Sequence, residues 1–316
     1  MSAGKSFRLV ASLFACAVLS TPAHAVFRAY LASDGLDTNP CTLVAPCRLL
    51  PAALAAVDDG GEIWMLDSAN YNTATVNIGK SVSILAVPGA IGSILGTSGP
   101  AVSITAAGLQ VALRNLVIIA QAGGSATHGI SMTGASNLSV EHCLIANMPS
   151  HGISIVGTGK LKVAHSILRY NGDYAVYAQN GPRVEVTSSQ VLAGLGGAGG
   201  INAYATGNST TVVTVSDSVF SGNSPGGHAI YGFATISTGI IRIAVTRSTL
   251  EGFTYGLRCE TTDVGSAELS VSASTITNNS LGWRVNGIDA VIYTLGNNHF
   301  TNNFSNNGSM TATPLM

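Results

Sequence analysis

Seven side chains that could bind a sugar recur in the C-terminal half of the chain, in two interleaved series with intervals of 25 to 29 residues. They are Tyr177, Asn202, Tyr204, Tyr231, Phe233, Arg258 and Arg284. Aromatic rings pack on the apolar faces of sugars, and guanidinium groups bind carboxylates through paired hydrogen bonds. The set therefore predicts a surface that binds polysaccharide or a cell-surface glycan. The alternative is that Tyr and Phe are simply frequent on exposed strands.

Candidates for catalysis are fewer: Arg258, Glu260 and Arg284. A glycoside hydrolase needs two carboxylates, and beside Glu260 the sequence offers only Asp263 in the adjoining loop. A calcium-dependent lyase needs several carboxylates around the ion, and no such cluster recurs, so we predict no cofactor. Either arginine could act as a lyase base only if another group neutralised the substrate carboxylate.

Two pairs of histidines invite a metal interpretation. His128 and His151 occupy equivalent places in consecutive repeats, as do His142 and His165. Each pair could approach within about 5 Å if the repeats stack. Zinc needs three or four ligands, and the next equivalent positions hold Tyr and Ser. We therefore predict surface histidines and no metal site.

A sequence repeat that occurs seven times must position these residues. Each copy has a small residue, an apolar residue, a loop, an apolar-x-apolar segment, two turn residues, a serine and another apolar residue. The copies begin at Gly129, Gly152, Ala175, Gly200, Ala229, Gly256 and Gly282. Their intervals are 23, 23, 25, 29, 27 and 26 residues. A period in the twenties built from short strands is typical of a solenoid of stacked coils.

Apolar residues alternate within each copy and predict three strands per coil, the pattern of a right-handed parallel β-helix in which coils stack about 4.8 Å apart. The inward residues of the first strand are Ile130, Ile153, Val176, Ile201, Ile230, Leu257 and Trp283. Those of the second strand form two series, Leu138, Leu161, Val184, Val213, Ile243, Leu269 and Tyr293, and Val140, Val163, Val186, Val215, Val245, Val271 and Leu295. Those of the third strand are Ile145, Leu168, Val191, Phe220, Leu250, Ile276 and Phe300. The sugar-binding candidates then face outward from the first strand.

Small polar residues recur as well. Equivalent positions hold Ser166, Ser189, Ser218, Ser248 and Ser274, with Cys143 and Asn298 as substitutes. Another set falls together at a turn and comprises Asn171, Asn223, Asn279 and Asn303. We expect these asparagines to adopt the left-handed conformation, which Asn tolerates better than most residues.

The first 25 residues have the features of an export signal. Lys5 and Arg8 precede an apolar run, and Ala23-His24-Ala25 is a small-x-small cleavage site, so the mature chain would start at Val26. The apolar run is too short to span a bilayer, which needs about 20 residues. No later stretch is apolar enough to span. We expect export to the periplasm or beyond.

Net charge and hydrophobic content limit the classes of partner that the chain could bind. Removing residues 1–25 removes two of the 14 basic residues and none of the 15 acidic ones, which leaves a net charge of −3. That balance argues against nucleic acid, which needs a basic face. Hydrophobic residues make up 46% and charged residues 9% of the chain, so it can bury a large core. We expect a monomer.

The segment ahead of the repeats predicts a cap. Apolar residues at i, i+3, i+4 and i+7, from Leu50 to Val57, form the stripe of a helix that Gly60-Gly61 would end. Cys41 and Cys47 bracket a short loop and predict a disulfide in an oxidising compartment. The two remaining cysteines, Cys143 and Cys259, lie about four coils apart, too far to bridge, and we expect both to be buried and free.

The segment SDGLDTNPCTLVAPCR at 33–48, the following GGEIWMLD at 60–67 and the repeats together resemble secreted bacterial right-handed parallel β-helix repeat proteins of the pectin-lyase-like superfamily. The resemblance covers essentially the whole mature chain. It implies an active groove along the outer face of the first strand of each coil. An epimerase-like pairing of His228 with Tyr231 or Tyr255 is conceivable, but the Asp-Pro-His signature of that activity is absent.

We therefore expect a signal peptide at 1–25, an N-terminal segment with a capping helix at 26–61, an all-β solenoid of about nine to ten coils at 62–305 and a frayed tail at 306–316. Three functions stay open, because a fold does not fix its function. They are a non-catalytic polysaccharide binder, a polysaccharide lyase, hydrolase or epimerase with an atypical site, and a structural or adhesive solenoid.

Overall fold

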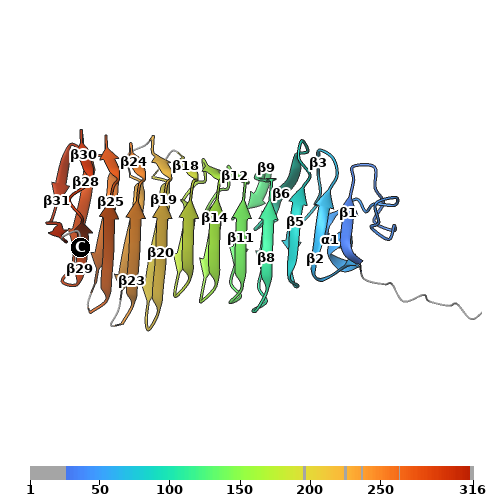
Figure 1. The fold of residues 1–316 in the computed structure, drawn as a ribbon, viewed down its shortest axis with the longest axis horizontal. Helices are drawn as coiled ribbons and strands as arrows, with labels where there is room; N and C mark the ends of the chain where they lie inside the picture. The colour runs from blue at the N-terminus through green and yellow to red at the C-terminus, as the bar shows by residue number, and fades with distance from the viewer. Residues whose placement is uncertain (1–25, 195–196, 224–225, 236–237, 263, 314–316) are drawn as a thin grey trace, which may run out of the picture.

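Three parallel sheets wind around one long axis in a β-solenoid of about nine turns, as Figure 1 shows. The computed structural model describes residues 26–194, 197–223, 226–235, 238–262 and 264–313. The described residues begin at Val26, so the export signal predicted at residues 1–25 lies outside them. Each coil contributes one strand to each sheet, and the sheets are called sheet 1, sheet 2 and sheet 3 in the order in which the repeat meets them.

Sheet 1 contains β4 (Val76–Asn77), β7 (Val102–Ile104), β10 (Ile130–Met132), β13 (Ile153–Val156), β16 (Tyr174–Gln179), β19 (Gly199–Thr206), β22 (His228–Thr235), β25 (Tyr255–Thr261), β28 (Leu281–Asn286) and β31 (Ser305–Asn307). Sheet 2 contains β1 (Val26–Leu31), β2 (Val57–Met65), β5 (Val82–Ala86), β8 (Gln110–Arg114), β11 (Asn137–Glu141), β14 (Lys160–Ala164), β17 (Arg183–Thr187), β20 (Thr210–Ser216), β23 (Ile240–Thr246), β26 (Ser266–Ser272), β29 (Ala290–Thr294) and β32 (Thr311–Ala312). Sheet 3 contains β3 (Ala69–Asn70), β6 (Gly92–Gly99), β9 (Leu116–Ala126), β12 (Leu144–Ala146), β15 (Ile167–Arg169), β18 (Gln190–Leu192), β21 (Val219–Ser221), β24 (Thr249–Glu251), β27 (Thr275–Thr277) and β30 (His299–Thr301).

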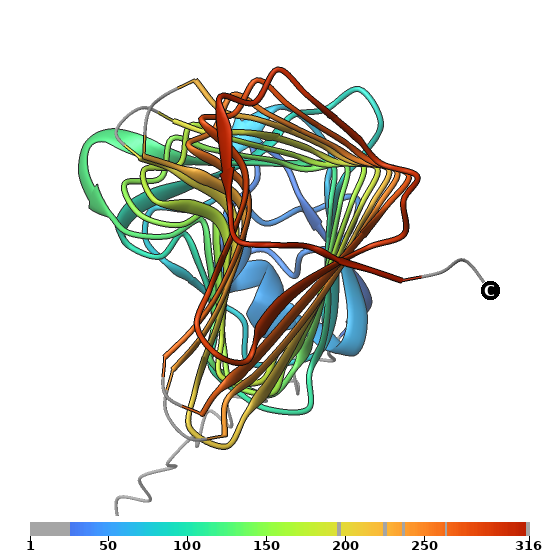
Figure 2. The same ribbon diagram turned by 90° about the vertical axis from the view of Figure 1, so that its left-hand side faces the viewer.

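Figure 2 looks along the axis that the three sheets enclose. The buried apolar residues of successive coils form one core along this axis. The inward series of the first and third strands pair in the predicted register, from Ile130 opposite Ile153 to Leu257 opposite Trp283, and on sheet 3 as far as Phe300. The predicted right-handed parallel β-helix is confirmed at the level of individual strand pairs.

The prediction for the second strand was wrong in the last coil. Leu269 pairs with Ile292 and Val271 with Thr294, so the inward position belongs to the fully buried Ile292 and not to Tyr293. Tyr293 and Leu295 form an apolar-x-apolar pair that fits the repeat as well as the true register does. A shift of one residue moves a side chain to the opposite face of a sheet, so Tyr293 faces outward.

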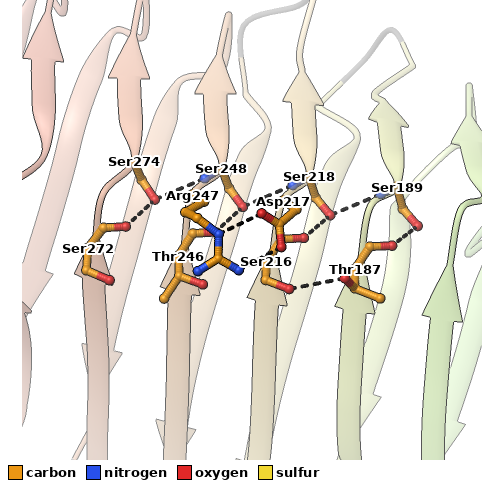
Figure 3. Close-up of polar contacts among 10 residues, drawn as sticks. All are labelled: Thr187, Ser189, Ser216, Asp217, Ser218, Thr246, Arg247, Ser248, Ser272 and Ser274. Atoms are coloured by element: carbon orange, nitrogen blue, oxygen red, sulfur yellow. Dashed lines mark hydrogen bonds and ion pairs between the residues drawn. The ribbon is translucent and has the colours of Figure 1, made fainter.

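The serine positions form a buried hydrogen-bonded ladder at the turn between sheets 2 and 3 (Figure 3). The Ser218 hydroxyl donates to the Ser216 carbonyl over 2.7 Å and accepts the Ser189 amide at 3.2 Å. The same pattern repeats up the stack to Ser274, whose amide donates to the Asn298 side chain over 3.0 Å. Each serine thereby satisfies backbone groups of two coils that the turn leaves without ladder partners.

The asparagine ladder is present, but our reason for it was wrong. Asn279 is buried, and its amide donates to Asn303 Oδ1 over 3.0 Å. The left-handed residue is the preceding one in three of the four coils: Tyr170 with φ 54°, Asn278 with φ 54° and Asn302 with φ 53°. The ladder asparagines hold the turn through side-chain hydrogen bonds between coils, while their neighbours absorb the unusual backbone angle.

Helix α1 (Leu50–Ala56) packs on β1 and β2 at the N-terminal end of the stack (Figure 1). Its buried residues Leu50, Ala53 and Leu54 join the core, as the apolar stripe predicted. The helix ends before the predicted Gly-Gly stop, because the buried Val57 already begins β2. The cap covers apolar surface and strand edges that a first coil would otherwise expose.

The structure confirms the predictions for the four cysteines that follow residue 25. Cys41 and Cys47 form a disulfide with their Cα atoms 4.6 Å apart. Cys143 and Cys259 are free and buried, and burial raises the pKa of each thiol to about 12.

The solenoid continues beyond its predicted end at residue 305, because β31 pairs with β28 and β32 pairs with β29. Strand pairing therefore reaches Ala312, inside the segment expected to fray.

Candidate functional site

The sugar-binding candidates do lie together on the outer face of sheet 1. On consecutive strands from β16 to β28, Tyr177 pairs with Asn202, which pairs with Tyr231. Tyr231 pairs with Arg258, and Arg258 with Arg284. The second series, Tyr204, Phe233 and Glu260, runs beside the first with the same register. The spacing in the sequence therefore placed all of these residues on one face.

Glu260 lies at the centre of this face between two arginines. Its Oε2 accepts a hydrogen bond from Arg258 Nη2 at 2.7 Å and one from the Tyr231 hydroxyl at 3.0 Å. Its Oε1 is 3.0 Å from Arg284 Nε, an ion pair by distance that lacks the angle of a hydrogen bond. Glu260 is only 5% exposed. A buried carboxylate held by two cations is an electrostatically rigid centre, because breaking either pair would leave an uncompensated charge.

Aromatic rings surround the Arg258 guanidinium. Its carbon lies 4.5 Å from the Tyr231 ring centre and 4.9 Å from the Tyr255 ring centre, within cation–π distance. Arg258 Nη1 also lies 3.2 Å from His228 Nε2, which therefore acts as the acceptor. Burial and then the positive charge of Arg258 lower the pKa of His228 to about 4. Burial raises the pKa of Tyr231 far above its usual value.

The sequence reasoning recognised only the first three members of a third outward column, and only as candidate metal ligands. The column consists of the residue two places before each inward apolar residue of the first strand, and it reads His128, His151, Tyr174, Gly199, His228, Tyr255 and Leu281. Its rings stack from coil to coil: the ring centres of His128 and His151 are 5.1 Å apart and those of His228 and Tyr255 are 5.0 Å apart. The signal was present, since counting back two residues in every copy finds the column.

Ring stacking within the face determines what it offers to a ligand. His151 lies between His128 and Tyr177, with interplanar angles of 3° and 9°. Tyr204 stacks on Phe233 at 5.5 Å and 18°. Rings on neighbouring coils thus cover one another's faces, as the spacing of a parallel sheet dictates. Little of His151, His228 and Tyr231 is left for solvent, whereas the half-buried Tyr177 and Tyr204 keep part of their rings accessible.

The two histidine pairs stack as closely as the sequence predicted, but the prediction of a surface position is wrong for His151, which is buried. His142 and His165 lie 5.0 Å apart on exposed left-handed turn positions. On sheet 1, His151 Nδ1 accepts the Tyr174 amide at 3.4 Å and lies 3.6 Å from an Asp173 carboxylate oxygen. Burial lowers the pKa of His151 to about 4, although the neighbouring Asp173 carboxylate favours the charged imidazolium and acts in the opposite direction.

Metal and acid–base chemistry find few groups here. Within the described part of the chain, no cluster of three or more His, Cys, Asp or Glu side chains is placed to hold a metal ion. Asp263, the second carboxylate considered for hydrolysis, lies outside the described residues. Glu260 has both oxygens engaged by cationic partners. The arrangement is therefore suited to binding polar groups through fixed guanidinium and hydroxyl donors.

Comparison with known proteins places the fold. A family model described as right-handed beta helix region matches residues 103–243. No curated protein sequence matches the chain. Among solved structures, pectate lyase Pel9A superposes with a TM-score of 0.63 at 15% identity, covering 91% of this chain and 77% of its own. XylC in complex with xylose gives 0.57 at 8% identity, with 85% and 75% covered.

An alginate lyase from Paenibacillus sp. str. FPU-7 gives a TM-score of 0.51 at 12% identity, covering 88% of this chain and 99% of its own. At such identities the likeness concerns the fold alone. Among the described residues, no helix has the length and apolar character needed to cross a membrane. The strand registers, the family match and these superpositions agree that the chain folds as a right-handed parallel β-helix.

Proposed function

We propose that the protein is exported and binds polysaccharide along the outer face of sheet 1, over β16 to β28. The observation that carries the proposal is the fixed pair of guanidinium groups around Glu260. The Arg258 and Arg284 side chains remain 20% and 33% exposed although Glu260 holds both. Arginines immobilised in this way lose little further side-chain entropy when a ligand binds, which favours affinity.

Accessible polar side chains support the same function. The partly exposed Tyr177 and Tyr204 share this face with the two arginines. These tyrosines add hydroxyl groups. Sugars, which carry hydroxyl groups on every residue, match a surface of closely spaced polar donors and acceptors.

Binding without cleavage fits Glu260 better than catalysis does. A general acid or base must be able to exchange a proton with the substrate, whereas this carboxylate is held by two guanidiniums and one phenol. The solved structures that resemble the chain include proteins named as polysaccharide lyases. The proposal transfers their ligand class, polysaccharide, and not their reaction.

A second candidate is a polysaccharide-cleaving enzyme, favoured by His228. Its imidazole is neutral near pH 7 because its pKa is lowered to about 4, and it contacts Arg258 beside the Tyr231 ring. Strongly shifted groups gather at active sites. His228 would then act as the base once Arg258 turns from His228 Nε2 to a substrate carboxylate, which frees the one lone pair of the neutral imidazole.

One experiment separates the two candidates. The mature chain, expressed from Val26, is incubated with acidic and neutral polysaccharides, and both affinity and the masses of any new oligosaccharides are measured. Retention of a polysaccharide without new products supports the binder. New products that disappear in a His228→Gln variant would replace it with the enzyme. Failure to bind any polysaccharide in the panel would remove both and favour a structural solenoid.

A further inference from the structure

A groove runs along the outer face of sheet 2, away from the site on sheet 1. Its main part has a volume of about 690 Å³ and extends over the strands from β5 to β20. A smaller hollow of about 240 Å³ shares Val212 and Thr214 with it and continues to Tyr293 on β29. Since coils are spaced about 4.8 Å apart, the six strands of the main part span roughly 24 Å. The groove is long enough for several residues of a linear polymer.

The lining of the main groove lacks aromatic rings, and it combines apolar surface with hydroxyl, amide and charged side chains. Its hydroxyl and amide side chains come from successive coils and include Ser83, Gln110, Asn137, Ser139 and Thr214. Single-stranded nucleic acids depend on aromatic side chains on which bases stack, and this lining offers none. Peptides that add to a sheet need a free strand edge, but every strand from β5 to β20 is paired on both sides. The mixed lining fits a ligand that has both hydroxyl groups and apolar faces, as sugars do.

Three exposed cations gather in the middle of the groove. Lys160 pairs directly with Arg183 on the next strand, and Lys162 pairs with Glu185. Among the described residues, neither Lys160 nor Arg183 forms a salt bridge, unlike Arg114 on the same sheet, which contacts Glu141. Like charges opposite each other on neighbouring strands are destabilising. A bound anion would relieve this repulsion, so the pair is better explained by a ligand than by folding.

We infer that this groove is a second binding site, and that it takes a linear polysaccharide bearing carboxylates. Carboxylates of a polyuronate would contact Lys160 and Arg183, and its hydroxyl groups would meet the serine and amide side chains. The spacing of the coils is comparable to the length of one sugar residue, so successive sugars can face successive coils. The inference does not depend on sheet 1 binding a ligand, since the two faces share no residue.

The test compares two arginines that are both exposed on strands. Arg183→Gln removes a cation from the groove, whereas Arg169→Gln removes one from β15 on sheet 3 and serves as the control for net charge. Affinities for polygalacturonate, alginate and neutral dextran are measured by calorimetry at two salt concentrations. We expect Arg183→Gln to weaken binding of both uronates roughly tenfold, the loss of one charge-assisted contact. Arg169→Gln should leave the affinity unchanged.

Several outcomes would overturn the inference. They are equal affinities of the two variants, dextran binding as tight as uronate binding, and displacement of the uronates by single-stranded DNA or an acidic peptide. A stability measurement adds an independent arm: Lys160→Gln should raise Tm slightly because it removes repulsion from Arg183, and a fall in Tm would contradict that. Arg284→Gln on sheet 1 distinguishes the two proposals, since it should leave the contribution of Arg183 intact.

Discussion

The ring of Tyr174 lies over Gly199, and a β-carbon at residue 199 would come within 2.5 Å of Tyr174 Cε1. Gly199 is the one position of the third outward column on β16 to β25 that carries no side chain. The tyrosine fills the vacant rung and approaches His228, two coils away, with ring centres 6.4 Å apart. A missing side chain thus keeps the stack of rings continuous.

Gly199→Ala should therefore destabilise the protein and disturb the ring stack. Overpacking of this kind costs about 1–3 kcal/mol, measured by urea unfolding, and near-UV circular dichroism should change with it. Gly79→Ala is the matched control, because a β-carbon there meets nothing within 4 Å. Equal stabilities of the two variants would show that the Tyr174 ring moves aside at no cost.

Removal of the central carboxylate should be far more costly than removal of a surface one. Glu260→Gln leaves Arg258 and Arg284 without their counter-charge, and we expect a loss of about 2–4 kcal/mol in the free energy of unfolding. Asp217→Asn is the comparison, since Asp217 and Arg247 form an exposed pair at 2.7 Å (Figure 3). That variant should lose little stability, because solvent screens an exposed ion pair. Similar losses would mean that solvent screens the buried cluster as well as it screens the surface.

Acidification should destabilise the fold through two histidines. The pKa of both His151 and His228 is lowered to about 4 in the folded protein, against about 6.5 in an unfolded chain. The unfolded state therefore binds more protons between these values, and stability falls as the pH drops from 6.5 toward 4. The slope is at most about 1.4 kcal/mol per pH unit for each histidine.

The measurement is urea unfolding across that range of pH. His228→Gln should flatten the dependence, whereas His142→Gln, on an exposed turn, should not. An unchanged slope in His228→Gln would show that other groups control acid stability.

Much of this fold could be predicted because a parallel β-helix repeats its register. Once the period was known, the outward series from Tyr177 to Arg284 followed by counting. The register of the last coil could not be predicted, because Tyr293 and Leu295 fit the inward pattern in the sequence. Only the pairing with β26 shows which residues of β29 point inward. Counting also could not supply the contacts around Glu260, which depend on rotamers of long side chains across three strands.

Two further features lay beyond the sequence for physical reasons. Aromatic residues suggested open faces for sugars, but rings on adjacent coils are close enough to stack on each other and leave only part of each ring accessible. The groove on sheet 2 is formed jointly by residues of six coils, and no local pattern in the sequence records such a surface. Its cations, Lys160 and Arg183, appear in the sequence as ordinary polar strand positions.

The accessible part of the Tyr204 ring leads to a prediction about how this residue engages a sugar. If the ring edge binds through its hydroxyl group, Tyr204→Phe should weaken polysaccharide affinity roughly threefold to tenfold, the value of one hydrogen bond. If the ring face packs on the sugar instead, the phenylalanine should retain the affinity and only Tyr204→Ala should lose it. Tyr170→Phe, an exposed tyrosine on sheet 3's side of the coil, controls for loss of a phenol. Full affinity in both Tyr204 variants would remove this residue from the proposed surface.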